Sequence, residues 1–166
     1  MVVYDSLFGN TAEIAKTIAD TLTAHGSVAL LSVNAVSALD LEGASLVVVG
    51  CPTQCRRVSL AVQTLLDCLP PHRLAGVRVV AFDTRYDQSR WFCGSAARRL
   101  VRRLAKLGGS VLLPPESFFV VAREGPLKPG ERERAATWSR LILDRLAALD
   151  ARPAPPPRGV WGFQVP

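Results

Sequence analysis

Short apolar runs rich in β-branched residues alternate along the chain with longer segments whose apolar residues recur every three or four positions. Several of the runs are apolar at consecutive positions, which is typical of strands buried on both faces of a parallel sheet. The predicted strands are residues 1–4, 28–33, 46–49, 77–82, 111–113 and 118–121. Because only Pro114, Pro115, Glu116 and Ser117 separate the last two runs, these are expected to act as one interrupted strand.

Four of the longer segments have helical periodicity, namely residues 11–24, 59–69, 95–107 and 130–149, and residues 35–41 predict at most a short helix. Strict alternation of strands and helices implies right-handed crossovers, with helices on both faces of the sheet. Five strand positions connected in this way predict an α/β fold with a doubly wound five-stranded parallel sheet in the order 2-1-3-4-5.

The chain of 166 residues is long enough for one domain, at about 150 residues per domain. We expect residues 1–150 to form that domain and residues 151–166 to form a Pro-rich tail, in which Trp161 and Phe163 are available to dock on the body or on a partner. No apolar run approaches the roughly 18 residues of a membrane span. The first strand leaves no room for a signal peptide, and four cysteines do not make a disulfide framework. A reduced, cytoplasmic protein without membrane contacts is therefore expected.

The charge of the chain is unevenly distributed. The net charge is +6; residues 1–70 hold three basic and six acidic side chains, whereas residues 71–166 hold seventeen basic and eight acidic. Arg98, Arg99, Arg102 and Arg103 recur at helical spacing opposite an apolar stripe. This pattern indicates either a solvated helix face or a positive surface that attracts an acidic partner or nucleic acid. No helix-turn-helix signature and no aromatic-and-basic RNA motif accompanies it, so nucleic acid is not expected as a partner.

Candidate chemistry lies in the segments that follow the first, third and fourth strands, because ligands of such sheets bind beyond the carboxyl ends of the strands where the strand order reverses. The first of these segments, Ser6-Leu7-Phe8-Gly9-Asn10-Thr11, runs directly into a predicted helix. Its backbone N–H groups, two hydroxyls and the helix N-terminus are able to bind a phosphate without any Lys or Arg. Gly9 allows a close approach of the backbone.

Residues 2–11, with Ala15 and Ile18, resemble the phosphate-loop signature of flavodoxins. Further similarity to flavodoxin-domain proteins lies in residues 50–54, 82–85, 94–97, 115–120 and 124–127. The resemblance covers about residues 2–149 and implies a short-chain, flavodoxin-like domain whose first loop holds the 5′-phosphate of FMN.

The resemblance also implies a flavin ring between the second and third segments, with Tyr86 stacking on it. Tyr86 and Trp91 are equally compatible with ordinary packing over the sheet edge. Arg85 either supplies a cation near the N1/C2=O edge of the flavin or forms an ion pair with Asp83 or Asp87. No catalytic side chain and no metal ligand is expected. The implied cofactor-binding residues are Ser6, Leu7, Phe8, Gly9, Asn10, Thr11, Pro52, Thr53, Gln54, Cys55, Thr84, Arg85, Tyr86 and Trp91.

Two departures from the family pattern matter. The loop after the third strand, Cys51-Pro52-Thr53-Gln54-Cys55-Arg56, lacks the tryptophan and glycine found in many flavodoxins. Because a peptide flip without glycine is costly, we expect weak stabilisation of the one-electron-reduced flavin and hence a tendency towards two-electron chemistry. The basic charge differs from that of the usual acidic flavodoxin, so an acidic surface is expected on the partner.

Two functions remain from the sequence. One is an FMN-binding redox protein, either an electron carrier or a small flavin reductase, which acts on a redox partner protein or a small-molecule electron acceptor. The alternative is a flavodoxin-like interaction module that has lost FMN and works through its arginine face and Pro-rich tail. The intact Ser6–Thr11 loop favours the first, and the altered loop after Gly50 favours the second. Cys51, Cys55 and Cys93 either include a thiol pair at the site or are idle.

Overall fold

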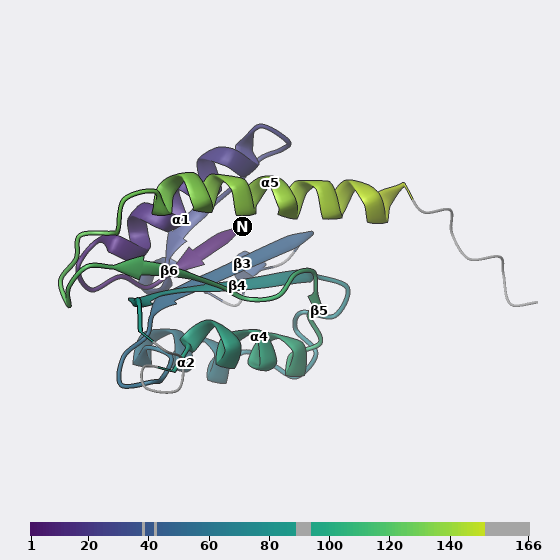
Figure 1. Cartoon of the computed structure of the whole chain (residues 1–166). Helices are drawn as coiled ribbons and strands as arrows, with labels where there is room; N and C mark the ends of the chain where they lie inside the picture. Colours follow the sequence, from purple (N-terminus) through teal and green to yellow (C-terminus); the bar gives the residue numbers. More distant parts are fainter. Residues whose placement is uncertain (38, 42, 89–93, 152–166) are drawn as a thin grey trace, which may run out of the picture.

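A parallel sheet forms the centre of the molecule in this computed structural model, which describes residues 1–37, 39–41, 43–88 and 94–151 (Figure 1). Its strands are β1 (Val2–Tyr4), β2 (Leu30–Ser32), β3 (Leu46–Pro52), β4 (Arg78–Tyr86), β5 (Ser110–Val111) and β6 (Glu116–Val120). The order is β2-β1-β3-β4, with β5 and β6 both paired to β4. All pairings are parallel, which confirms the predicted order 2-1-3-4-5.

The last strand position is divided into two segments, as the sequence predicts. β5 pairs with the beginning of β4, where Val79 faces Val111, and β6 pairs with its end, where Phe82 faces Glu116. Pro114 and Pro115 lie between the two segments and have no N–H group to donate to the ladder. The chain therefore leaves the edge of β4 and returns to it two residues out of step.

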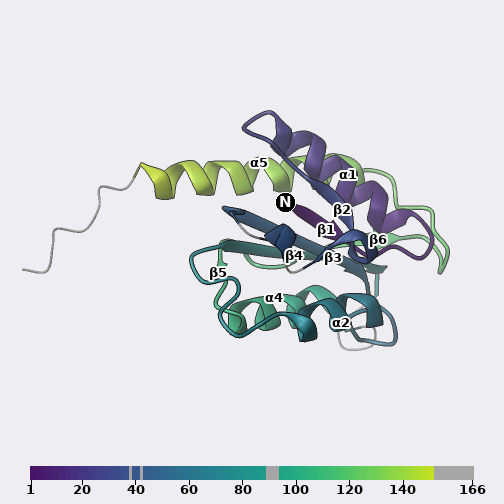
Figure 2. The same cartoon turned by 180° about the vertical axis from the view of Figure 1, so that it is seen from behind.

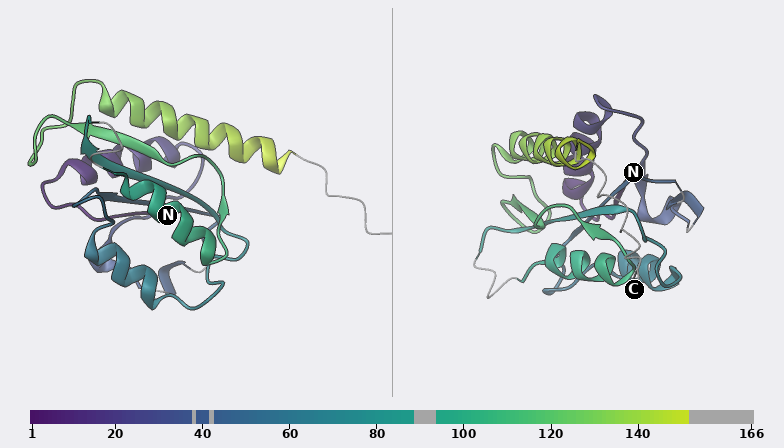
Figure 3. Two further views of the ribbon diagram at one scale, coloured as in Figure 1. Left: turned by 60° about the horizontal axis from the view of Figure 1, so that its bottom comes forward. Right: turned by 90° about the vertical axis from the view of Figure 1, so that its right-hand side faces the viewer.

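Helices cover both faces of the sheet, as Figures 1 and 2 show from opposite sides. α1 (Asn10–Thr23) and α5 (Glu131–Asp150) lie on one face, and α2 (Leu60–Cys68) and α4 (Ala96–Lys106) lie on the other. The right-hand view in Figure 3 shows the sheet between the layer of α1 and α5 and the layer of α2 and α4. The bounds agree with the predicted helices to within one or two residues, and the predicted short helix is two 3₁₀ turns, η1 (Val33–Ala35) and η2 (Leu39–Leu41).

Alternation along the central strands sends side chains into two separate cores. Val47 and Val49 pack on the side of α2 and α4, whereas Val48 packs on the side of α1 and α5. In the second core the rings of Phe82, Phe118 and Trp138 meet edge to face, with centroids 6.0–6.4 Å apart.

Gly50 of β3 provides the room that this aromatic cluster needs. A Cβ atom on Gly50 would lie only 2.0 Å from Cζ of Phe82. The glycine is thus required by packing and not by backbone conformation.

In the described part of the chain, no helix has the length and hydropathy needed to cross a bilayer. Residues 152–166 of the predicted tail (151–166) and the site candidates Trp91 and Cys93 lie outside the described residues. The boundary of the domain at residue 150 therefore stays a prediction.

Candidate cofactor site

A cavity of about 620 Å³ opens at the carboxyl ends of β1, β3, β4 and β6. This volume is in the range of small-molecule and cofactor pockets. Twelve of the fourteen predicted site residues line it; Gly9 belongs to the first loop without lining the cavity, and Trp91 is outside the described residues. The lining residues are Ser6, Leu7, Phe8, Asn10, Thr11, Pro52, Thr53, Gln54, Cys55, Thr84, Arg85, Tyr86, Val120 and Arg123.

The loop from Ser6 to Thr11 presents a row of free amide groups. Gly9 precedes α1 with φ of 85°, a left-handed conformation that favours glycine. The N–H of Ala12 donates to Ser6 Oγ at 3.2 Å, and the N–H of Glu13 donates to the Gly9 carbonyl at 2.9 Å. Among the described residues, the N–H groups of residues 6–11 form no hydrogen bond. Free amides at a helix N-terminus form an anion-binding site.

The two hydroxyls of this loop retain donor capacity. Thr11 Oγ1 lies 2.8 Å from Thr84 Oγ1 on β4, and both residues are buried. A hydroxyl donates one hydrogen bond and accepts two. Ser6 therefore accepts from Ala12 and keeps its own proton, and Thr11 keeps its proton when Thr84 donates. The donors of this loop fit a phosphate dianion. The loop contains no cation, so it would bind the phosphate without neutralising its charge.

The second loop, after β3, is a two-residue hairpin turn. Gln54 and Arg57 exchange backbone hydrogen bonds of 3.1 and 2.7 Å, and the residues between them, Cys55 and Arg56, have φ of 46° and 67°. Positive φ at both central positions is the requirement of a type I′ turn, which usually contains Asn-Gly. The turn was not predicted, because neither residue is typical of it.

Asp83 connects the loop after β3 with the segment that leads from β4 into α4. It is fully buried, and its Oδ2 accepts hydrogen bonds from Thr53 Oγ1 at 2.9 Å, Ser95 Oγ at 2.8 Å and the N–H of Ala97 at 3.0 Å. Thr53 Oγ1 in turn accepts from the N–H of Ala96 at 2.9 Å. A single carboxylate thus fixes the loop after β3 to the end of β4 and the first turn of α4.

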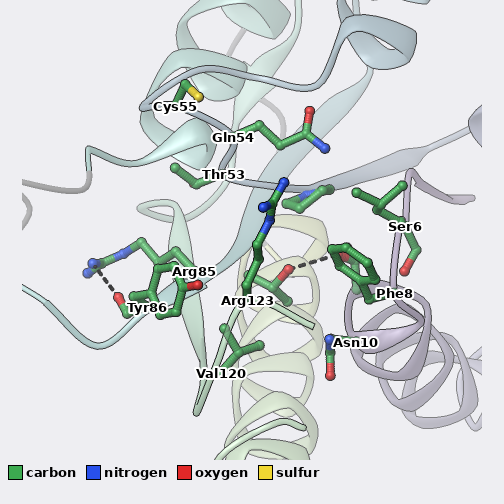
Figure 4. Close-up of a pocket in the computed structure, with 14 residues that line it drawn as sticks. Ser6, Phe8, Asn10, Thr53, Gln54, Cys55, Arg85, Tyr86, Val120 and Arg123 are labelled. Atoms are coloured by element: carbon green, nitrogen blue, oxygen red, sulfur yellow. Dashed lines mark hydrogen bonds between the residues drawn. The ribbon is translucent and has the colours of Figure 1, made fainter. Parts of the chain in front are cut away.

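Arg85 forms neither of the ion pairs considered from the sequence. It is only 7% exposed, its Nη1 donates to the carbonyls of Tyr86 and Gln88 at 3.1 and 2.8 Å, and its guanidinium lies 5.0 Å from the ring centroid of Phe119. Asp87 pairs with Lys128 instead, at 2.7 Å, and this hydrogen bond and charge lower the pKa of Asp87. Figure 4 shows the Arg85 guanidinium directed to the side of the pocket where Tyr86 lies.

Val120 and Arg123 line the cavity but are not among the residues predicted from the sequence. Arg123 extends across the pocket in the direction of Thr53 and Gln54 (Figure 4). Its loop is tied to the first loop, because Asn10 Nδ2 donates to the Glu124 carbonyl at 3.0 Å. The topology alone indicates this segment. The last strand is parallel to the others and ends at the same edge of the sheet, so the segment after it also borders the ligand-binding edge.

The cysteines of the site differ in character. Cys51 is fully buried, and desolvation is the main cause that raises the pKa of its thiol to about 12. Cys55 is exposed at the turn. Cys51 is therefore a neutral core thiol at physiological pH, unsuited to nucleophilic or redox chemistry.

The architecture and the pocket define a doubly wound α/β protein with a loop of free amides after its first strand. The chain belongs to the flavodoxin family, whose profile matches residues 2–138. Proteins of this family bind FMN and transfer electrons to redox partners.

Solved structures share the fold over almost the whole chain. A flavodoxin from the domain Archaea is 18% identical, covers 88% of this chain and 96% of its own, and has a TM-score of 0.72. Flavodoxin 2 from Bacillus cereus is 20% identical, with 87% and 97% covered and a TM-score of 0.74. Rubredoxin oxygen:oxidoreductase from Desulfovibrio gigas is 20% identical with a TM-score of 0.72, but the match covers 91% of this chain and 36% of that one. A search of curated proteins finds no match.

Proposed function

We propose that this chain is a cytoplasmic FMN-dependent electron-transfer protein, either a carrier or a small flavin reductase. It exchanges electrons with a redox protein that has an acidic surface, or passes them to a small-molecule acceptor. The observation that carries the proposal is the loop of residues 6–11, whose free N–H groups and two hydroxyls border the 620 Å³ cavity.

Different residues of the pocket would contact the phosphate and the ring of the cofactor. The loop of residues 6–11 binds the phosphate through its amides and the hydroxyls of Ser6 and Thr11. Gln54 and Cys55 border the ring on one side, and Tyr86, which is 38% exposed and lines the pocket, offers an aromatic face on the other. When bound, FMN supplies the redox chemistry, and the protein supplies orientation and electrostatics.

The roles of the loop are tested by comparing FMN with riboflavin, which lacks the phosphate. Ser6→Ala removes one donor and the acceptor of the Ala12 N–H. We expect FMN to bind about tenfold to a hundredfold more weakly, since a hydrogen bond to a charged group contributes about 1.5–3 kcal/mol. Riboflavin should bind equally to both proteins, as measured by quenching of flavin fluorescence.

Thr17→Ala is the matched control. The Thr17 hydroxyl donates to the Glu13 carbonyl within α1 and lines no part of the cavity. FMN affinity should not change in this variant. A colourless preparation that takes up no added FMN would instead favour an interaction module without cofactor.

A further inference from the structure

The excess positive charge of the folded domain is concentrated on one face of the sheet. α4 carries five cations and no carboxylate, and α2 carries a single charged residue, Asp67. On the opposite face, α1 carries one cation and two carboxylates, and α5 carries four of each. The two faces therefore present different electrostatic surfaces, although they cover the same sheet (Figure 1).

Most of the cationic side chains on α4 have no partner in the part of the chain that the structure describes. Arg103 pairs with Asp67 of α2. The guanidinium groups of Arg98, Arg99 and Arg102 have no hydrogen-bond or ion-pair partner among the described residues, and all three residues are exposed. Exposed charges that lack internal partners are free to act on a ligand or a partner.

The positive charge continues to the edge of the cofactor pocket. Arg56 and Arg57 are exposed on the type I′ turn whose residues Gln54 and Cys55 line that pocket. The turn lies against the start of α4, because a Cβ on Gly94 would be 2.8 Å from Arg56 Cβ. The left-handed φ of Cys55 and Arg56 costs about 1–2 kcal/mol per residue, and such strain is typical of functional segments.

We define the basic surface by Arg56, Arg57, Arg98, Arg99, Arg102 and Lys106. We propose that it is the docking site for an acidic redox protein, an inference that rests on the proposed function. Charge complementarity selects the partner: residues 94–115 contain no carboxylate, and residues 44–82 contain only Asp67. A protein seated on this face places its redox centre beside the turn that borders the cofactor.

Each encounter would transfer one electron from the reduced centre of the partner to the cofactor held by the pocket, with no covalent bond made or broken. Two encounters, with protons taken from solvent, would supply the two electrons of a full reduction.

The test measures electron transfer from a reduced [2Fe–2S] ferredoxin, chosen for its acidic surface and a potential of about −400 mV, to the FMN-loaded protein. Arg98→Gln/Arg102→Gln removes two cations from the basic surface. Arg140→Gln/Arg145→Gln removes two exposed cations from α5 and is the matched control. Neither pair includes a residue of the pocket. Flavin absorbance and reduction by dithionite are recorded first for each protein.

We expect the second-order rate constant of the α4 pair to fall about fivefold to tenfold at ~10 mM ionic strength, where steering acts over long distances. The α5 pair should change less than about twofold, and the difference between the pairs should vanish at ~0.5 M salt, where the charges are screened.

Equal rates for both pairs would overturn the docking site and leave the proposed function intact. Binding of a short DNA duplex that is lost only in the α4 pair would overturn it in favour of a nucleic-acid surface. Absence of bound flavin in the parent protein would overturn the proposed function, and the docking site with it.

Discussion

Arg123 places a positive charge at the pocket, whereas the loop of residues 6–11 contains no cation. The guanidinium lines the cavity and has no hydrogen-bond or ion-pair partner in the part of the chain that the structure describes. A cation close to a flavin stabilises the negatively charged, reduced form.

Replacing Arg123 by Gln should therefore lower the midpoint potential of bound FMN. At an effective dielectric constant of about 20 and a distance of about 8 Å, the lost attraction is about 2 kcal/mol. This corresponds to about 40 mV for a two-electron couple. Redox titration against dyes of known potential measures the shift, and Arg140→Gln on α5 is the control. An unchanged potential would show that Arg123 turns away when flavin binds.

Arg56 holds a conformation that glycine adopts without strain. Its φ of 67° belongs to the left-handed region. Arg56→Gly should stabilise the protein by about 0.5–1 kcal/mol, because relief of about 1–2 kcal/mol exceeds the entropic cost of glycine, about 0.5–1 kcal/mol. Urea unfolding of the variant measures the gain. Arg57→Gly, next in the chain but without positive φ, should be destabilising; stabilisation by both changes would contradict the explanation.

At the scale of elements, Asp83 links β4 to the loop after β3 and to α4. Asp83→Ala leaves Thr53, Ser95 and the Ala97 N–H without their acceptor. We expect a loss of about 2–4 kcal/mol in the free energy of unfolding and weaker FMN binding, since the turn is no longer fixed. Asp83→Asn keeps one oxygen for these donors and should lose less. If Ala and Asn variants unfold at the same urea concentration, the three hydrogen bonds contribute little.

The elements themselves follow from apolar spacing, because burial on both faces leaves consecutive apolar residues in strands and a periodic stripe in helices. The ends of the strands follow less well than those of the helices. β4 was expected to stop at Phe82 but continues to Tyr86. Asp83, Thr84 and Arg85 are polar yet buried. Asp83 and Thr84 form hydrogen bonds with groups of other elements, and the guanidinium of Arg85 lies over the ring of Phe119 in β6. A local pattern of hydropathy contains no information on such distant partners.

The same distinction applies to the site. The loops after three strands were predicted from topology alone, and the structure brings their residues together around one cavity. The type I′ turn at Cys55 and Arg56 was not predictable, because neither residue favours a positive φ and the contact of Arg56 with Gly94 is a tertiary one.

At the scale of the whole molecule, the pocket joins loops from both ends of the chain, so FMN should stabilise the entire fold. A ligand at a hundred times its Kd adds about 2.7 kcal/mol, which raises Tm by about 5–10 °C for a domain of this size. Removal of FMN by dialysis against chaotropic salt should reverse the shift, as followed by circular dichroism. A Tm independent of FMN would mean that the nucleotide is not held in the folded pocket.

The interruption between β5 and β6 has a consequence for the behaviour of the protein in concentrated solution. A continuous outermost strand would expose an unpaired ladder on which a neighbouring chain is able to add a strand of its own. Here that border offers two short pieces separated by Pro114 and Pro115, and the opposite border, β2, is only three residues long. Neither border provides a long template for amyloid-like association, so the break in the sheet also protects the protein against aggregation.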